Sequence, residues 1–284
     1  MIRGAASLRE GAVAVLETPA PADKIALTHD LAAAWRVGTL PLGPAVTAPP
    51  RPARPPKPEL RLPRDMPKRR SAGSVASRVA LLHALAHIEL NALDLAWDLI
   101  ARFGAENSPR GFYDDWLRVA DEEATHHGLL AERLAHYRAA YGDLPAHDGL
   151  WQAAETTAHD LLARLAVVPL VLEARGLDVT PVMIASLDKA GDTASADVLR
   201  VIYRDEIGHV AIGRRWFDAL CATHGVEPEG TYQELVRRHF RGKLKRPFNT
   251  AARDEATLNR PRSSCPPPPP ATATAATPAP LRRK

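Results

Sequence analysis

The sequence contains two pairs of residues whose types and spacing suit metal binding, Glu123 with His126 and Glu206 with His209. A glutamate and a histidine three residues apart on a helix point in nearly the same direction, so both side chains can reach one ion. The spacing alone has low specificity, because such a pair arises easily by chance in a chain with 11 histidines. Their positions on predicted helices make the two pairs significant.

Each pair interrupts an apolar stripe that should face a protein core. Four segments show apolar residues at alternating steps of three and four, which is typical of amphipathic helices. These segments are about 73–103, 110–140, 149–175 and 192–223. Single glutamates, Glu89 and Glu173, interrupt the first and third stripes in the same way. The stripes run Leu82, Leu85, Glu89, Ala92, Ala96, Leu99 and Phe103; Trp116, Val119, Glu123, His126, Leu130, Leu134 and Tyr137; Leu162, Ala166, Pro169, Glu173 and Gly176; and Val198, Ile202, Glu206, His209, Gly213, Trp216 and Leu220.

Four carboxylates in one core need a cationic partner, because burying an unpaired carboxylate is costly and neighbouring carboxylates repel one another. None of the four stripes offers a lysine or arginine. The order glutamate, Glu-x-x-His, glutamate, Glu-x-x-His is that of di-iron and di-manganese bundles. The sequence therefore predicts two iron ions, with manganese as the alternative, since carboxylate-rich sites accept both. The predicted ligands are Glu89, Glu123, His126, Glu173, Glu206 and His209, and Asp205 is predicted to orient a ligating histidine through a hydrogen bond.

Neighbouring residues leave alternatives open. His83 and His87 lie four residues apart and could hold a zinc ion. Helical geometry turns them roughly 120–160° away from Glu89, so we interpret them as structural residues or as contacts around the ligands. Glu122 and His127 lie beside predicted ligands, and a rotation of the second helix would exchange their roles.

The elements that position these residues are predicted to be helical. Gly104, Gly142 and Gly225 stand where the long helices should end. Prolines every few residues from 41 to 67 forbid helix, and we expect an extended strap wrapped over the bundle rather than a disordered linker. Further short helices are expected at about 7–17, 22–37, 181–189 and 230–240. The predicted organisation is short helices in 1–40, a Pro-rich basic strap in 41–72, an all-α four-helix bundle in 73–225, a C-terminal helix and basic segment in 226–256, and a disordered Pro/Ala/Thr tail in 257–284.

Composition agrees with a soluble helical protein. Hydrophobic residues make up 45% and charged residues 25% of the 284 residues, and the low aromatic share of 5% favours packed helices over sheet. Two distant cysteines imply no disulfide framework. The first ten residues lack the apolar stretch of a secretory signal, and no apolar run approaches the ~20 residues that span a bilayer. We therefore expect a cytoplasmic protein without a membrane partner.

The net charge of +4 is spread unevenly, with two basic runs. Such runs can bind a nucleic acid or a phosphorylated ligand, although more often they are solvated or pair with the protein's own acids. The runs are Arg51, Arg54, Lys57, Arg61, Arg64, Lys68, Arg69 and Arg70, and Arg237, Arg238, Arg241, Lys243, Lys245 and Arg246.

Several stretches resemble an uncharacterised bacterial ferritin-like family that is catalogued as a domain of unknown function. The resemblance covers about residues 7–255 and implies a ferritin-like fold with a di-metal site on the six ligands named above. More distantly, it extends to di-iron tRNA hydroxylases. After Ala256 the sequence departs from the family pattern. The stretches are HALAHIELNALDLAWD from His83, DEEATH from Asp121, RDEIGH from Arg204, RPARPP from Arg51, MPKRR from Met66 and LKRPFN from Leu244.

These observations favour an oxygen-dependent di-iron oxidase or hydroxylase that uses molecular oxygen and an unknown substrate, tRNA-like if the basic runs bind phosphate. A ferroxidase, or an iron- or manganese-handling protein without an organic substrate, is the alternative. About 70 residues precede the predicted bundle, which argues against the compact protomer of a storage cage. A structural or interaction protein with a stabilising metal site is the third reading.

Overall fold

The computed structural model describes residues 5–62, 65–66, 72–104, 108–242, 244 and 246–258. Within this part of the chain all regular elements are helical, and β pairing is limited to one isolated parallel bridge between Leu60 and Ala146. The predicted all-α class is therefore confirmed for the described residues. The elements are α1 (Leu8–Glu17), α2 (Pro21–Arg36), α3 (Val75–Phe103), α4 (Arg110–His136), α5 (Gly149–Thr156), α6 (Leu161–Val167), η2 (Val168–Glu173, a π-helix), α7 (Ala174–Lys189), α8 (Thr193–His224), α9 (Pro228–His239) and α10 (Thr250–Glu255).

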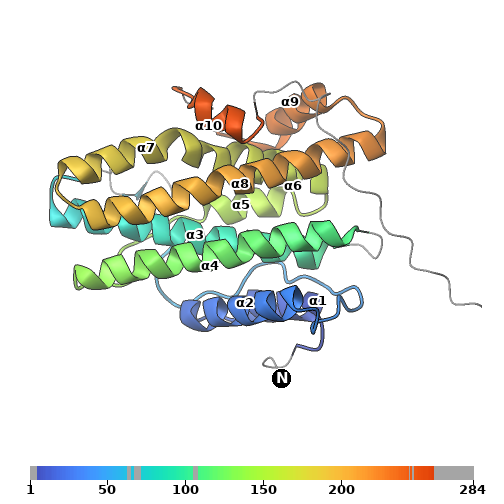
Figure 1. Cartoon of the computed structure of the whole chain (residues 1–284), viewed down its shortest axis with the longest axis horizontal. Helices are drawn as coiled ribbons and strands as arrows, with labels where there is room; N and C mark the ends of the chain where they lie inside the picture. The colour runs from blue at the N-terminus through green and yellow to red at the C-terminus, as the bar shows by residue number, and fades with distance from the viewer. Residues whose placement is uncertain are drawn as a thin grey trace, which may run out of the picture.

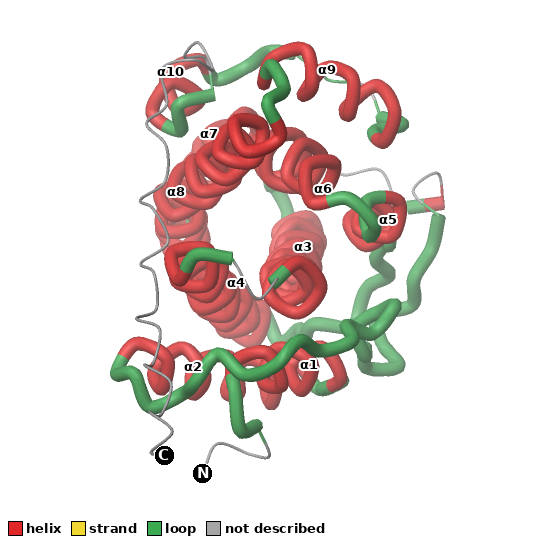
Figure 2. The backbone as a smooth tube through the Cα atoms, turned by 90° about the vertical axis from the view of Figure 1, so that its right-hand side faces the viewer, coloured by secondary structure: helices red, strands yellow, loops and turns green. Residues whose placement is uncertain are grey.

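The long helices surround one interior. Helices α3, α4 and α8, together with the succession α6, η2 and α7, are referred to below as the central helices. Figure 2 looks along them and shows them arranged around a common interior. Trp97, Trp116 and Phe217 are fully buried in one apolar cluster that the central helices share with α1 and α2. Apolar burial of this kind is the main source of stability for such a helical core.

Shorter helices cover the two sides of the central helices. Figure 1 shows α1 and α2 against α3 and α4, and α9 and α10 on the opposite side beside α7 and α8. A hydrogen bond of 3.0 Å from the Trp97 indole to the Thr28 hydroxyl joins α3 to α2. On the other side, Arg253 of α10 pairs with buried Asp178 of α7 at 2.8 Å.

Residues 41–62 contain no helix and run along α3 and the turn at 141–148. Arg102 of α3 donates a hydrogen bond of 2.8 Å to the carbonyl of Pro49. Arg54 pairs with Asp94 of α3 at 2.7 Å, and Arg51 pairs with Asp148 and with Glu155. The described arginines of the first basic run are thus paired with the protein's own acids. Arg64, Lys68, Arg69 and Arg70 lie outside the described residues.

The third long helix differs from the prediction. The prediction of a single helix over 149–175 is wrong. Helix α5 ends at Thr156, and a new helix, α6, begins after Asp160, whose side chain accepts a hydrogen bond from the amide of Ala163. Helix α6 then passes into the π-helix η2, which carries Pro169 near its start. A proline removes one backbone donor and clashes with the preceding turn, which disturbs a regular α-helix, although α7 accommodates Pro181 in its interior. The helical piece expected at 181–189 is the second half of the continuous helix α7.

Other helix ends lie close to their predicted positions. Helix α8 ends at Gly225, whose φ of 65° suits a residue without a side chain, as predicted. Helix α4 ends at His136, earlier than expected, because Arg138 adopts a left-handed φ of 57°. Helix α10 was not predicted. The tail predicted to be disordered lies outside the described residues from 259 onward.

Helix α3 is apolar enough over part of its length to cross a membrane, contrary to the sequence expectation. The most apolar 18-residue window of this helix is 67% buried inside the fold. Burial of this extent is what the core helix of a soluble protein shows.

Candidate metal centre

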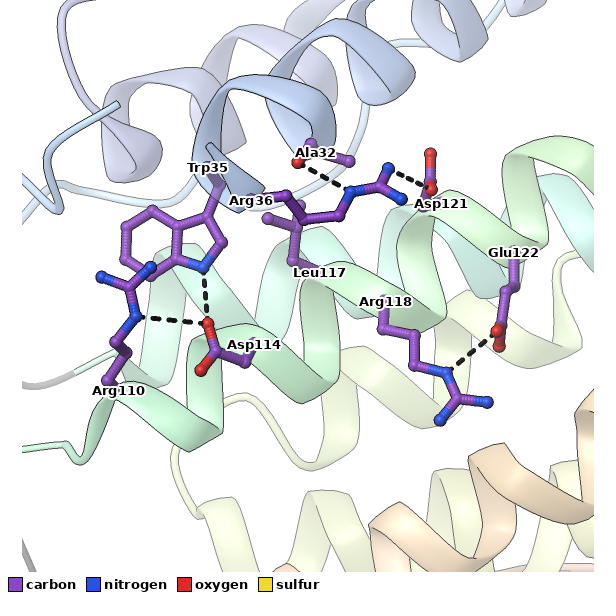
Figure 3. Close-up of a pocket in the computed structure, with 9 residues that line it drawn as sticks. All are labelled: Ala32, Trp35, Arg36, Arg110, Asp114, Leu117, Arg118, Asp121 and Glu122. Atoms are coloured by element: carbon purple, nitrogen blue, oxygen red, sulfur yellow. Dashed lines mark hydrogen bonds and ion pairs between the residues drawn. The ribbon is translucent and has the colours of Figure 1, made fainter. Parts of the chain in front are cut away.

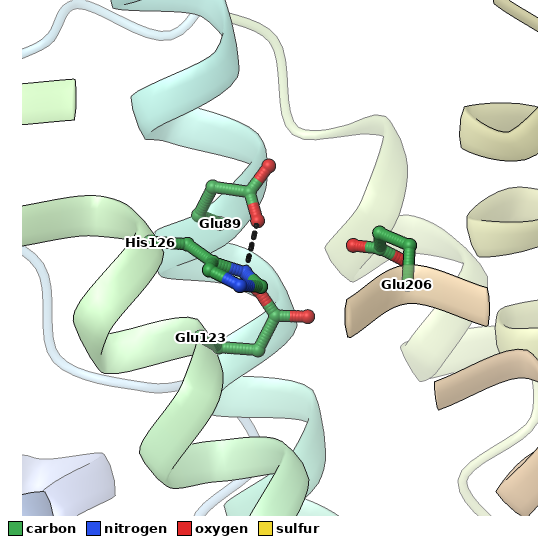
Figure 4. Close-up of side chains that lie close together, drawn as sticks. All are labelled: Glu89, Glu123, His126 and Glu206. Atoms are coloured by element: carbon green, nitrogen blue, oxygen red, sulfur yellow. Dashed lines mark hydrogen bonds and ion pairs between the residues drawn. The ribbon is translucent and has the colours of Figure 1, made fainter. Parts of the chain in front are cut away.

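Four predicted ligands meet in the interior. Glu89 projects from α3, Glu123 and His126 from α4, and Glu206 from α8 (Figure 4). One ligand atom from each lies within 4.8 Å of those of the others, and all four residues are buried. Such a cluster of carboxylate and imidazole groups could hold a metal ion.

Glu123 lies between the two histidines. Its Oε2 is 3.4 Å from Nδ1 of His126, and its Oε1 is 3.1 Å from Nδ1 of His209. Nδ1 of His126 is also 3.3 Å from Glu89, and Nδ1 of His209 is 3.9 Å from Glu206. Both imidazoles therefore turn Nδ1 toward the interior carboxylates.

Glu173 reaches this region from the end of η2. It lines the same cavity as Glu89 and Glu206, and its carboxylate is buried. The segment that carries it packs closely on α8, because a Cβ added to Gly213 would lie 2.6 Å from Cγ of Pro169. π-helical turns are rare and occur often at functional sites. The sequence signal for this one was Pro169 on the third stripe, which we interpreted as an ordinary core position.

Two further acids hold the outer nitrogens of the histidines. Nε2 of His126 is 3.2 Å from Asp205, and Nε2 of His209 is 2.8 Å from Glu122. Once an imidazole is neutral, as metal binding requires, a carboxylate that accepts at Nε2 keeps the proton on that nitrogen and leaves the Nδ1 lone pair for the ion. The predicted contact of Asp205 with a ligating histidine is present. The contact of Glu122 with His209 was not predicted. Asp205 and Glu122 each directly precede the glutamate of a Glu-x-x-His pair, and this shared position could have indicated both contacts.

Burial raises the pKa of three interior glutamates. The pKa of Glu89 rises to about 8 and that of Glu173 to about 7, first because burial penalises the charged form and then because Glu123 is negative. The pKa of Glu206 also lies well above its ordinary value, for the same two reasons. Without a cation, these carboxyl groups therefore hold protons near neutral pH.

The pKa of Glu123 shifts in the opposite direction to the pKa values of these glutamates, whereas the pKa values of both histidines are raised. Burial works to raise the pKa of Glu123, but hydrogen bonds with His126 and His209 outweigh it and lower the pKa. Burial likewise works to lower the pKa of both imidazoles, yet their carboxylate contacts raise it well above the ordinary value. The interior thus behaves as a negative carboxylate flanked by two cationic imidazoles, with protons on the remaining acids.

Unsatisfied atoms show that these residues fit a metal ion. Several buried atoms form no well-directed hydrogen bond with the part of the chain that the structure describes: Oε2 of Glu89, Oε1 of Glu123, Oε2 of Glu173, Oε2 of Glu206 and Nδ1 of His209. Among them, Oε1 of Glu123 and Nδ1 of His209 face each other at 3.1 Å, and Oε2 of Glu89 lies 3.3 Å from Nδ1 of His126. Buried polar atoms without partners are uncommon in folded proteins. Among the described residues, no lysine or arginine forms an ion pair with these glutamates. A metal ion would satisfy all five atoms.

The alternative ligands lie elsewhere. His83 accepts a hydrogen bond of 2.9 Å from the amide of Gly142, and His87 contacts the Tyr141 hydroxyl at 2.8 Å. These two residues therefore fix the turn after α4. His127 lies 2.8 Å from the carbonyl of Ala86, on the side of α4 that faces α3.

An outer groove of about 500 Å³ lies between α2 and α4, on the far side of Glu122 from the cluster (Figure 3). Its charges are already paired, as Arg36 binds Asp121 at 2.7 Å and Arg118 binds Glu122 at 2.9 Å. Of the residues that line the groove, Glu122 also contacts His209.

Comparisons with known proteins place this all-helical chain with its buried carboxylate–histidine cluster in a family. The family described as "Protein of unknown function (DUF455)" matches residues 17–262, and the chain belongs to it. An uncharacterised protein of Haemophilus influenzae is 44% identical over 207 residues, which cover 71% of this chain and 72% of that protein. No solved structure matches the chain.

Proposed function

We propose that the chain has a ferritin-like fold and binds two iron ions, with manganese as the alternative. The observation that carries this proposal is the set of buried carboxylate and imidazole atoms without hydrogen bonds, contributed by α3, α4, η2 and α8. Carboxylate-rich sites with imidazole suit ferrous iron and manganese. The proposed ligands are Glu89, Glu123, His126, Glu173, Glu206 and His209, with Glu123 in contact with both histidines.

The proposed activity is that of an oxygen-dependent oxidase or hydroxylase. Bound ferrous iron supplies the electrons with which molecular oxygen is reduced. Hydroxylation would place one oxygen atom in a C–H bond and reduce the other to water, with two protons and two electrons from an external reductant. Glu122 and Asp205 hold the histidines in one orientation, and the apolar walls keep water away from the ligands.

The cavity beside the proposed ligands favours an enzyme with an organic substrate over a protein that only handles iron. Glu89, Glu173 and Glu206 border an apolar cavity of about 340 Å³, which a ferroxidase does not need. Because the described arginines of the first basic run pair with the protein's own acids, the second basic run is the one that would suit a phosphate-bearing substrate such as a tRNA. We propose a cytoplasmic location.

Oxygen uptake by the reconstituted protein tests this function against its alternatives. The protein is mixed without air with an excess of ferrous iron over its sites and then exposed to oxygen, with Glu206→Ala alongside as the measure of oxidation outside the site. Uptake that stops once the bound iron is oxidised, and that is lost in the variant, supports an oxidase or hydroxylase. Continuing uptake with growing ferric mineral would support iron handling instead. Bound iron that does not react with oxygen would support a structural role.

A further inference from the structure

A cavity of about 340 Å³ lies directly beside the candidate metal centre. Helices α3, α7 and α8 form most of its wall, and η2 and α5 contribute the rest. Its volume falls at the lower end of the range for ligand-binding cavities, about 300–1,000 Å³. The apolar residues of the wall are Leu85, Ile88, Ala92, Leu150, Leu172, Val179, Met183, Leu199 and Ile202.

One side of this cavity carries carboxylates that the fold leaves unsatisfied. Glu89, Glu173 and Glu206 line it, and each has a buried Oε2 without a hydrogen bond from the described residues. The rest of the wall offers only two polar side chains among the described residues, Arg175 and Thr180. A ligand in the cavity therefore meets the proposed metal ligands on one side and hydrocarbon on the others.

We propose that this cavity binds the apolar end of the substrate, a hydrocarbon chain or ring. This inference rests on the proposed function, because it assigns the substrate class of the same site. At about 30 Å³ for a water-sized group, the cavity holds on the order of ten non-hydrogen atoms. A polar group of that size would lose its hydrogen bonds to water without replacing them, whereas an apolar group gains by leaving water.

Because Gly176 has no side chain, it leaves part of the cavity open. It lies three residues after Glu173 on α7 and lines the cavity, and a Cβ added to it would meet no atom within 4 Å. A Cβ therefore fits at this position without displacing a neighbouring residue, and a longer side chain would extend into the cavity that Gly176 lines. Since glycine is a poor helix former, such a replacement also favours the helix.

The charge of Arg175 distinguishes two kinds of substrate that could supply the apolar group. Its guanidinium pairs with Asp178 at 3.4 Å, and its side chain is 38% exposed. A free apolar molecule would bind without reference to this charge. The apolar end of a larger, phosphate-bearing molecule would leave its anionic head near Arg175, where a positive charge favours it.

The experiment uses the full chain loaded anaerobically with ferrous iron and measures binding of octan-1-ol and octyl phosphate by calorimetry. Gly176→Leu fills the cavity. Gly128→Leu is the matched control, because Gly128 also lies in a helix with open space at its Cβ but does not line the cavity. Iron content is measured for every sample, so that failure of the metal proposal is seen separately from failure of the cavity proposal.

We expect octan-1-ol to bind wild type and Gly128→Leu equally, and Gly176→Leu at least tenfold more weakly, with iron content unchanged in all three. Tighter binding of octyl phosphate than of octan-1-ol would identify a substrate with an anionic head, and equal or weaker binding a free apolar molecule. Absence of octan-1-ol binding to wild type, or equal binding to Gly176→Leu, would overturn the proposal whatever the iron content.

Discussion

Nε2 of His209 on α8 lies 2.8 Å from Oε2 of Glu122 on α4. The reverse contact joins Nε2 of His126 on α4 to Asp205 on α8, at 3.2 Å. Each of these helices thus supplies the acid that holds the histidine of the other. Each acid directly precedes the glutamate of its own Glu-x-x-His pair, so a short repeated pattern builds both halves of the candidate centre.

Removing the outer acid should weaken metal binding without unfolding the protein. In Glu122→Ala the imidazole of His209 loses the group that fixes its orientation, and we expect metal affinity to fall about 10–100-fold. Glu122→Gln, which keeps an accepting oxygen, should lose less. Competition with a chelator measures the affinities, and Glu132→Ala, an exposed position on the same helix, is the control. Wild-type affinity in Glu122→Ala would show that this contact has no role in binding.

The stability of the metal-free protein should fall as pH rises from about 6.5 to about 8. Below this window the lowered pKa values of His83, His87 and His127, which are due mainly to burial, act in the opposite direction. The folded pKa values of Glu89, about 8, and Glu173, about 7, lie above the value of about 4.3 for an unfolded glutamate. The folded state therefore binds more protons than the unfolded state in this window, which makes the free energy of unfolding decrease with pH. The raised pKa values of His126 and His209 act in the same direction above about pH 6.5.

Urea unfolding of the metal-free protein at several pH values measures this slope. Because a bound metal takes the place of these protons, metal binding should release protons and flatten the pH dependence. Calorimetry in two buffers of different ionisation enthalpy measures the release. Stability that rises between about pH 6.5 and 8 without metal would contradict the assigned protonation.

Alanine substitutions at two glycines of α8 should have opposite effects on the stability of the protein. A Cβ at Gly213 would lie 2.6 Å from Cγ of Pro169, so Gly213→Ala must displace η2, and we expect a loss of about 1–3 kcal/mol. At Gly208 the nearest atom is the end of the Arg118 side chain, at 3.5 Å. Gly208→Ala should therefore be neutral or stabilise by up to about 1 kcal/mol. Thermal unfolding compares the two, and equal stability would show that η2 does not depend on this contact.

The packing of the Pro-rich strap on α3 should depend on the buried carboxylate of Asp94. Asp94 is fully buried and pairs with Lys24 at 2.5 Å and with Arg54 at 2.7 Å. Asp94→Ala leaves two cations without their partner, and we expect a loss of about 3–5 kcal/mol. Glu59→Ala, which removes the exposed pair with Arg61, should cost far less, because solvent screens that pair. Denaturant unfolding measures both, and similar losses would mean that burial of Asp94 adds nothing.

Helical periodicity predicted much of the interior. The stripes indicated that Glu89, Glu123, His126 and Glu206 face the same core, and these side chains do meet there. Periodicity could also choose between His126 and its neighbour His127, because a rotation of about 100° per residue separates their directions. Most of the helix ends followed from glycine and proline in the same local way.

The remaining features depend on tertiary packing. Contact between Glu122 and His209 requires a particular rotation of α4 against α8, which a single stripe does not specify. The π-helix before Glu173 arises from Pro169 together with its close packing on Gly213, and the stripe alone predicted a straight helix there. The cavity beside Gly176 likewise exists only once α3, α7 and α8 are assembled.

Metal content of the purified protein by elemental analysis tests the central claim most directly. Wild type is measured beside Glu123→Ala and Glu206→Ala, with Glu132→Ala as the exposed control. We predict about two iron ions per chain in wild type and control, lost in both interior variants. Absence of stoichiometric iron or manganese, even after reconstitution, together with interior variants that match wild type, would contradict the claim that the cluster is a metal centre.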